Sequence, residues 1–153
     1  MLEHMADQLD IFICPSCGKD LKIFNKGIQC IACGKYYIVD SGIPLLFCSE
    51  KYDKSKKDVT GVVKAFYEKT PFPNYEDFEN VGDLIQKAGK GVFACLLYEQ
   101  IPFNIRVLEV GCGTGQLSNF LGVAQRYIFG TDMCVNSLKM ADVFRSKNSL
   151  NRV

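Results

Sequence analysis

Three glycines at alternate positions, Gly111, Gly113 and Gly115, carry the clearest chemical signature of this 153-residue chain. They follow an apolar, β-branched run at 105–110 and precede a helical pattern at 116–121, which predicts a buried parallel strand, a tight turn and a helix. A turn of this kind brings backbone N–H groups and the positive end of a helix close to a ligand. The pattern predicts a site for a nucleotide-like cofactor.

The spacing of the glycines argues against a dinucleotide. A dinucleotide fingerprint places its third glycine at position 116, where this chain has Gln116, so a nicotinamide oxidoreductase is disfavoured. A second acidic residue is expected to end the next strand and to accept hydrogen bonds from the ribose hydroxyls, about twenty residues on. Asp132 comes 21 residues after Gly111 and is the candidate.

The run Glu-Val-Gly-Cys-Gly-Thr-Gly at 109–115 resembles the first motif of class I S-adenosylmethionine (SAM)-dependent methyltransferases. The resemblance implies that the loop passes beneath the methionine part of SAM. It also implies that Glu109 helps to hold the amino group of the cofactor and that Met133 lies against the adenine. The cofactor-binding residues expected on this basis are Glu109, Gly111, Cys112, Gly113, Gly115, Asp132 and Met133.

Two further motifs pair cysteines two residues apart, and they hold four of the eight cysteines of the chain: Cys14, Cys17, Cys30 and Cys33. With no secretory signal in the sequence, the paired spacing favours a metal site over disulfides. Four thiolates suit tetrahedral Zn²⁺, or iron in a rubredoxin-like site. With four thiolates and no open position, the metal is expected to be structural, and its binding would supply the folding energy of a module this small.

The segment 9–47 resembles the small zinc-ribbon family found fused to, or partnered with, methyltransferases. It carries both cysteine pairs, each followed by a glycine, and ends in Gly-Ile-Pro-Leu-Leu at 42–46. The resemblance implies a structural zinc and a connection with methyl transfer that agrees with the glycine loop.

The elements that position these motifs can be read from periodicity and from turn residues. In the first part we expect a short strand at 9–13, a hairpin of strands 21–24 and 28–31, and two further strands around a turn at 40–42. An amphipathic helix should start at 59 and end before Pro71, and a helical pattern over 77–100 should break at 89–91. A strand at 127–131 and a helix at 137–144 should follow the glycine loop.

The segment 66–75 is dense in aromatic residues and proline, and it resembles a segment that precedes the SAM domain in some bacterial methyltransferases. Two interpretations stay open for it. Its rings form a lid over the cofactor or substrate, or the segment is a rigid connector that packs its aromatic rings on the core.

These elements predict an α/β chain in three parts: an all-β zinc ribbon at 1–50, a linker and helical connector at 51–104, and the first βαβα part of a Rossmann-like methyltransferase sheet at 105–153. The next strand is expected to start at Arg152 and Val153. We therefore expect the chain to be the N-terminal portion of a longer enzyme or to work with a second chain. On its own it should bind SAM weakly or not at all, and none of its residues can be nominated as catalytic.

Composition sets outer bounds on function. With 18 basic and 17 acidic residues the net charge is +1, which gives no strongly basic nucleic-acid footprint, and no apolar run is long enough to span a membrane. A cytoplasmic enzyme is expected, with a small molecule, a protein or RNA as its methyl acceptor and no membrane partner. The alternative is a non-catalytic zinc-ribbon protein that binds a partner methyltransferase or another subunit.

Overall fold

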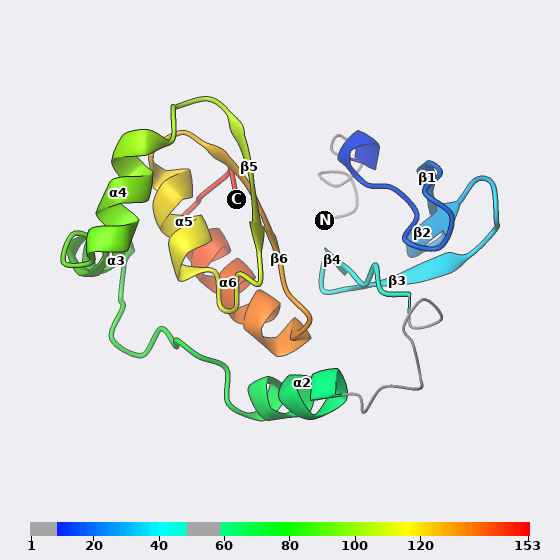
Figure 1. Cartoon of the computed structure of the whole chain (residues 1–153), viewed down its shortest axis with the longest axis horizontal. Coiled ribbons are helices and arrows are strands. Elements are labelled where there is room, and N and C mark those ends of the chain that lie inside the picture. Colours follow the sequence, from blue (N-terminus) through cyan, green and yellow to red (C-terminus); the bar gives the residue numbers. More distant parts are fainter. Residues whose placement is uncertain (1–8, 49–58) are drawn as a thin grey trace. The chain divides into compact units, whose positions relative to one another are not determined.

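The computed structural model describes residues 9–48 and 59–153. The chain forms two compact units, Met1–Asp58 and Val59–Val153. The first residues of the linker and connector predicted at 51–104, up to residue 58, lie outside the described residues. The described residues are mixed α/β, with an antiparallel four-stranded sheet in the first unit and a parallel two-stranded sheet with five α-helices in the second (Figure 1).

The first unit is a meander of short antiparallel strands. Strands β1 (Leu21–Phe24), β2 (Gly27–Cys30), β3 (Tyr36–Asp40) and β4 (Ile43–Pro44) are neighbours in chain order. The predicted hairpin is confirmed, with its tip between the paired residues Phe24 and Gly27. The core of this unit is small, with Ile28 completely buried at its centre.

One prediction for this unit is wrong. The strand expected at 9–13 is a 3-10 helix, η1, at Leu9–Ile11. The amide of Phe12 donates to the carbonyl of Leu9 (3.1 Å), which closes a turn. Pairing in this stretch is confined to a single bridge between Ile13 and Asp20, because the chain bends into the first cysteine pair directly afterwards.

The second unit begins with three helices. Helix α2 spans Val59–Lys69, and the helical pattern predicted at 77–100 divides into α3 (Val81–Ala88) and α4 (Val92–Gln100), broken at 89–91 as expected. Asn80 and Asp83 form a capping box that fixes the start of α3. The predicted apolar stripe of α2 is not buried within the described part of the chain, since Val62 and Phe66 are 70% and 60% exposed.

Strands β5 (Arg106–Val110) and β6 (Tyr127–Thr131) run parallel, with Glu109 opposite Gly130 and Val110 opposite Thr131. Helices α5 (Gln116–Val123) and α6 (Val135–Lys147) follow the two strands and lie on one side of the pair (Figure 1). The core between them contains Phe120, Ile128 and Phe144. The carboxyl ends of both strands therefore meet at one edge, where the glycine loop and Asp132 lie.

The far edge of β6 also has a backbone partner. The amide of Tyr127 donates to the carbonyl of Ile105, which precedes β5. Because consecutive residues of a strand direct their amides toward opposite edges, the amide of Ile128 points away from β5. The amide of Ile128 donates to the carbonyl of Arg152 (2.7 Å), which places Arg152 beside the edge of β6 away from β5. This is the position at which a further strand was predicted to start, although no strand is assigned there.

Candidate functional site

The four paired cysteines converge on one point. Their Sγ atoms all lie within 4.8 Å of one another, with Cys14 and Cys33 at 3.7 Å and Cys17 and Cys30 at 3.4 Å. A tetrahedral zinc with Zn–S bonds of about 2.3 Å requires sulfur separations of about 3.8 Å. The four thiols can therefore hold a metal ion, and their number and spacing are consistent with zinc.

The two cysteine pairs sit in turns of the same construction. In the first, the amide of Cys14 donates to Lys19 (2.8 Å), and the amide of Gly18 donates back to Cys14 (2.8 Å). The second pair repeats both bonds, with Cys30 in the place of Cys14, Lys35 in that of Lys19 and Gly34 in that of Gly18. Both glycines have left-handed backbone angles, φ +72° and +71°, which explains why a glycine follows each pair.

Hydrogen bonds favour the thiolate forms of the two buried cysteines. Burial alone would raise the pKa of Cys14, but donation from the hydroxyl of Tyr37 (3.1 Å) and from backbone amides of the turn outweighs burial and lowers the pKa to about 6. The backbone amide of Cys33 lowers the pKa of Cys30 in the same way. The thiolate is the form that ligates a metal ion. Tyr37, which sequence reasoning missed, belongs to this site.

The glycine loop in the second unit is held by hydrogen bonds to the end of β6, to Asp132 and within the loop itself. The amides of Gly111 and Cys112 both donate to the carbonyl of Thr131 (2.8 and 3.0 Å), and the amide of Gly115 donates to Cys112 (2.9 Å). The amide of Gly113 donates to Asp132 Oδ2 (2.8 Å). The loop therefore directs four of its amides to acceptors within the protein and not toward a bound ligand.

Asp132 and Glu109, the two predicted carboxylates, stand at the ends of neighbouring strands. Besides Gly113, Asp132 accepts from the amide of Cys134 (2.8 Å), so one of its oxygens holds the glycine loop and the other fixes the turn after β6. Glu109 accepts from the hydroxyl of Ser118 on α5 (2.5 Å). Burial raises the pKa of Glu109, although the hydrogen bonds from Ser118 act in the opposite direction.

Two glycines of the loop lie so close to other parts of the protein that a side chain would contact them. A Cβ built on Gly115 would lie 2.7 Å from the Cβ of Ala141 on α6, and one on Gly113 would lie 3.4 Å from the carbonyl oxygen of Phe72. The side chain of Met133, beside Asp132, is 40% exposed and available to a ligand. The loop thus lies against α6 on one side and against the proline-rich segment on another.

The segment at 72–75 is hydrogen-bonded to the glycine loop. Pro73 accepts a hydrogen bond from the hydroxyl of Thr114, and Asn74 accepts one from the side-chain amide of Gln116 (2.6 Å). Tyr75 donates its hydroxyl to the carbonyl of Thr114 (2.9 Å) and accepts from Asn119 (2.8 Å). The sequence left two interpretations of this segment open. In the structure, residues 73–75 pack along one side of the glycine loop and are hydrogen-bonded to it.

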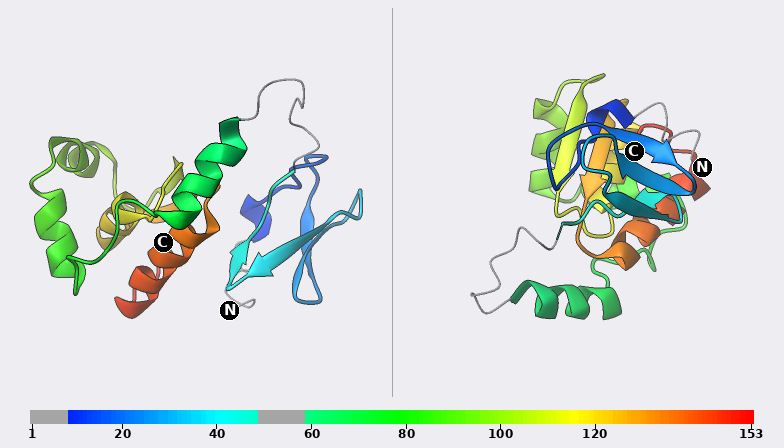
Figure 2. Two further views of the ribbon diagram at one scale, coloured as in Figure 1. Left: turned by 90° about the horizontal axis from the view of Figure 1, so that it is seen from below. Right: turned by 90° about the vertical axis from the view of Figure 1, so that its right-hand side faces the viewer.

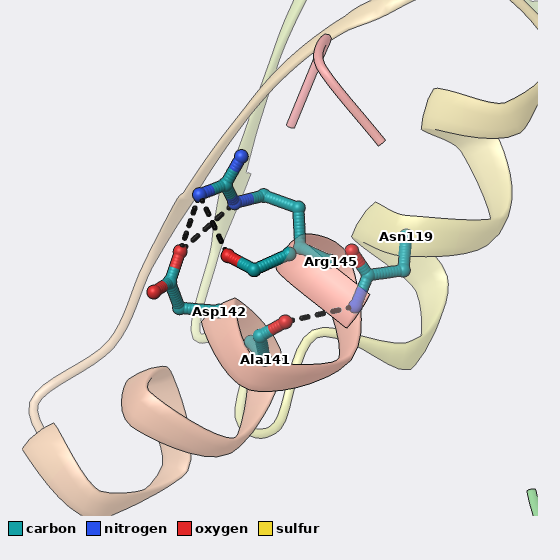
Figure 3. Close-up of polar contacts among 5 residues, drawn as sticks. Asn119, Ala141, Asp142 and Arg145 are labelled. Carbon is teal, nitrogen blue, oxygen red and sulfur yellow. Dashed lines mark hydrogen bonds and ion pairs between the residues drawn. The ribbon is translucent and has the colours of Figure 1, made fainter. Parts of the chain in front are cut away.

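Contacts of Tyr75 and Asn119 extend this wall into the core. The ring of Tyr75 stacks on Phe144 of α6 with centroids 4.4 Å apart. Asn119, which is completely buried, also donates to the carbonyl of Ala141 (3.3 Å), as Figure 3 shows beside the Asp142–Arg145 ion pair of α6. The loop, α5, α6 and the segment at 72–75 therefore hold one another in place.

Glu68, four residues before Phe72, connects the same part of the chain to the start of α6. The carboxylate of Glu68, near the end of α2, accepts from the amides of Val135 and Asn136 (3.0 and 3.2 Å) at the start of α6. Burial acts to raise the pKa of Glu68, but these two bonds, together with the Cys134 side chain and the positive charge of Lys64, outweigh burial and hold the pKa below its usual value. Figure 2 shows α2 beside this end of α6. The stretch 68–75 thus spans from the turn after β6 to the glycine loop.

A cavity of about 410 Å³ opens beside the loop, between α3, α4 and α5. Its walls are mostly apolar, and five residues of the strand–loop–helix unit line it: Glu109, Cys112, Gln116, Leu117 and Phe120. Asp132 and Met133 are not among its lining residues. The site predicted from sequence is therefore brought together at the strand ends, and the cavity lies next to its Glu109 side.

No protein-family model matches the chain, and no significant match to it occurs among curated proteins. Among the helices of residues 9–48 and 59–153, none is long and apolar enough to cross a membrane.

Proposed function

We propose that this chain is part of a SAM-dependent methyltransferase, in which the unit 59–153 binds the methyl donor and the four-cysteine module holds a structural zinc. The observation that carries the proposal is the hydrogen bond between the amide of Gly113 and the carboxylate of Asp132. Two motifs recognised separately in the sequence, the glycine loop and the acidic strand end, meet there at neighbouring strand ends.

The amides of the loop favour SAM over a dinucleotide. Pyrophosphate recognition relies on backbone N–H groups directed at the ligand. Here Thr131 and Asp132 accept the hydrogen bonds of Gly111, Cys112 and Gly113. A donor without phosphate needs no such cradle, and the carboxylates at Glu109 and Asp132 suit an amino group and ribose hydroxyls.

When bound, SAM supplies the methyl group for an in-line displacement. The residues of this chain contribute binding and orientation: Asp132 takes the ribose, Met133 lies against the adenine, and Glu109 holds the amino group. Positioning of this kind supplies much of the acceleration in such transfers. The acceptor is a small molecule, a protein or RNA, and a further part of the enzyme or a second chain would bind it.

The test is a binding titration of the zinc-loaded chain with SAM and, separately, with NAD. We expect weak binding of SAM, with a dissociation constant on the order of 1 mM, and no binding of NAD. Asp132→Ala should weaken SAM binding by about 1.5–3 kcal/mol, since it removes charge-assisted hydrogen bonds.

Gly113→Val should abolish SAM binding, because the side chain would sit in a left-handed backbone position (φ +54°) against the carbonyl of Phe72. Gly18→Val introduces the same kind of strain in the other unit (φ +72°) and should leave SAM binding intact. Unchanged affinity in the Gly113 variant, or binding of NAD in preference to SAM, would remove the basis of the proposal.

A further inference from the structure

Two of the four clustered cysteines are buried, and they occupy equivalent places. Cys14 and Cys30 are the first residues of the two cysteine pairs and are each 1% exposed, whereas the second residues, Cys17 and Cys33, are exposed. Each buried cysteine lies in the same kind of turn, in which its sulfur accepts hydrogen bonds from backbone amides. The backbone alone would therefore make Cys14 and Cys30 equivalent ligands of a metal ion.

One side chain breaks this equivalence. The hydroxyl oxygen of Tyr37 lies 3.1 Å from Sγ of Cys14, and this contact is buried. Within residues 9–48, the hydrogen-bond partners of Cys30 are cysteines and backbone amides, and no hydroxyl group is among them. A thiolate bound to a metal has no proton of its own, so the hydroxyl must be the donor in a metal-loaded site.

Strand β3 holds Tyr37 in this place. Side chains alternate along the strand, so Tyr37 is buried while its neighbours Tyr36 and Ile38 are exposed. Tyr37 pairs with Ile28 of β2, the completely buried residue at the centre of the small core. A buried hydroxyl without a partner would destabilise the fold, and the sulfur of Cys14 supplies that partner.

We propose that Tyr37 is a positioning residue of the metal site, whose hydroxyl holds the Cys14 thiolate on the metal and makes Cys14 the last of the four ligands to be released. The proposal rests on the zinc site of the proposed function and is independent of SAM. Hydrogen-bond partners of metal ligands fix the orientation of those ligands and contribute to metal affinity. The hydrogen bond also engages a lone pair of the sulfur, so the Cys14 thiolate is a poorer nucleophile than that of Cys30.

Tyr37→Phe removes the hydroxyl and keeps the ring. The variant should bind zinc about tenfold more weakly, the lower end of the effect expected for such a partner, in competition with a chelator. In the cobalt-loaded chain, the sulfur-to-cobalt charge-transfer band should move to lower energy, because one thiolate has lost a hydrogen bond. The d–d bands should keep their tetrahedral pattern, because all four sulfurs remain.

Two control variants separate this role from packing. Tyr36→Phe removes a hydroxyl from an exposed side chain of the same strand and should change neither the zinc affinity nor the charge-transfer band. Ile28→Val removes a buried methylene group opposite Tyr37. It should lower the stability of the first unit and leave the charge-transfer band in place.

The order of alkylation gives a second measurement, which needs no variant. Iodoacetamide forms an S–C bond with a cysteine thiolate and releases iodide. In the zinc-loaded, full-length chain, mass spectrometry should find that Cys14 is alkylated last of the four. In Tyr37→Phe, Cys14 should react at the same rate as Cys30. If Tyr37→Phe does not fold, the order of alkylation in the unaltered chain decides the proposal.

Three results would overturn the proposal, and they separate it from the zinc site itself. An unchanged charge-transfer band and zinc affinity in Tyr37→Phe would overturn the role of Tyr37 while the zinc site stands. Alkylation of Cys14 no later than Cys30 in the unaltered chain would do the same. An unaltered chain that binds neither zinc nor cobalt would overturn this inference together with the zinc site and would leave the proposal for SAM untouched.

Discussion

Tyr75 connects the proline-rich segment to the glycine loop through one hydroxyl group. That hydroxyl donates to Thr114 and accepts from Asn119, and Asn119 is completely buried. Burial raises the pKa of Tyr75 to about 12, with the hydrogen bond from Asn119 acting against this and nearby acidic groups acting with it. The hydroxyl therefore stays protonated at neutral pH and keeps its role as a donor.

Tyr75→Phe should lower the free energy of unfolding of the second unit by about 1–2 kcal/mol, because a buried carbonyl and a buried amide each lose a partner. Denaturant unfolding followed by circular dichroism measures this. Tyr98→Phe is the control, since the Tyr98 side chain is 40% exposed. Equal stability of the Tyr75 and Tyr98 variants would contradict the role of the hydroxyl.

Glu109 should give the stability a particular dependence on pH. Its pKa is raised by burial, so the folded chain holds the proton more tightly than the unfolded chain. The stability contributed by Glu109 is complete below its unfolded pKa and is lost as the pH rises through the folded pKa.

Glu109→Gln stays neutral at every pH and can still accept a hydrogen bond from Ser118. The variant should therefore gain in Tm relative to the unaltered chain as the pH is raised from about 4 to about 8. Thermal melts across that range provide the measurement. A Tm difference that stays constant, or that shrinks with rising pH, would show that burial does not raise the pKa of Glu109 in the folded chain.

At the scale of elements, the glycine loop packs closely against α6. Gly111 and Gly115 have nearly the same left-handed angles, φ +75° and +71°, but a Cβ on Gly111 meets nothing within 4 Å, whereas one on Gly115 would lie 2.7 Å from the Cβ of Ala141. Substitutions at Gly111 and Gly115 therefore distinguish the cost of backbone strain from the cost of crowding against α6.

Both Gly111→Ala and Gly115→Ala should cost roughly 1–2 kcal/mol for the backbone conformation. Gly115→Ala should cost about 1–3 kcal/mol more, because α5 and α6 must move apart. Chemical denaturation of the two variants gives the difference directly. Should Gly111→Ala prove as destabilising as Gly115→Ala, the packing of the loop on α6 would not be what requires a glycine there.

Local patterns in the sequence predicted many of these elements. The hairpin at β1 and β2, the break at 89–91 and the helix after Asp132 all follow from turn residues and apolar spacing close to them in the chain. The strand expected at 9–13 failed because the bend into Cys14 outweighs the strand preference of its apolar residues. The apolar face of α2 is exposed in the described part of the chain, although the apolar spacing predicted the helix itself correctly. Periodicity therefore predicts a helix but does not identify what its apolar face packs against.

The candidate site was predictable only in part, for the same reason. Glycine and carboxylate spacing pointed to Gly113 and Asp132, and the resemblance to the methyltransferase motif implied Glu109. The contacts of Tyr75 and Glu68 join residues dozens of positions apart, and no local pattern encodes them. The density of rings and prolines at 66–75, and the resemblance of this stretch to a segment of some bacterial methyltransferases, were the signals in the sequence that it mattered.

For the whole molecule, the four-cysteine cluster and the proposed donor site belong to separate compact units. The small core of the first unit depends on the turns that hold the four thiols, so we expect metal binding to supply much of its folding free energy. One zinc per chain is the expected content. Cys17→Ser should abolish zinc binding and unfold the strands β1–β4 while leaving residues 59–153 folded.

Elemental analysis and the NMR spectrum of the Cys17 variant measure both effects. Cys95→Ser, which alters a cysteine of α4 outside the cluster, should keep its zinc. Purified protein without zinc or iron, or loss of structure in both units together, would contradict the assignment of the metal to the first unit.

The central claim is that the ends of β5 and β6 bind SAM, and mapping the ligand onto the backbone tests it most directly. Amide resonances of the zinc-loaded, ¹⁵N-labelled chain should be recorded during titration with SAM. The largest shifts should come from Gly113 and Cys134, whose amides donate to Asp132, with no comparable shifts when NAD is added. If SAM leaves these two amides unmoved at saturating concentration, or if NAD moves them equally, the glycine loop is not a donor site.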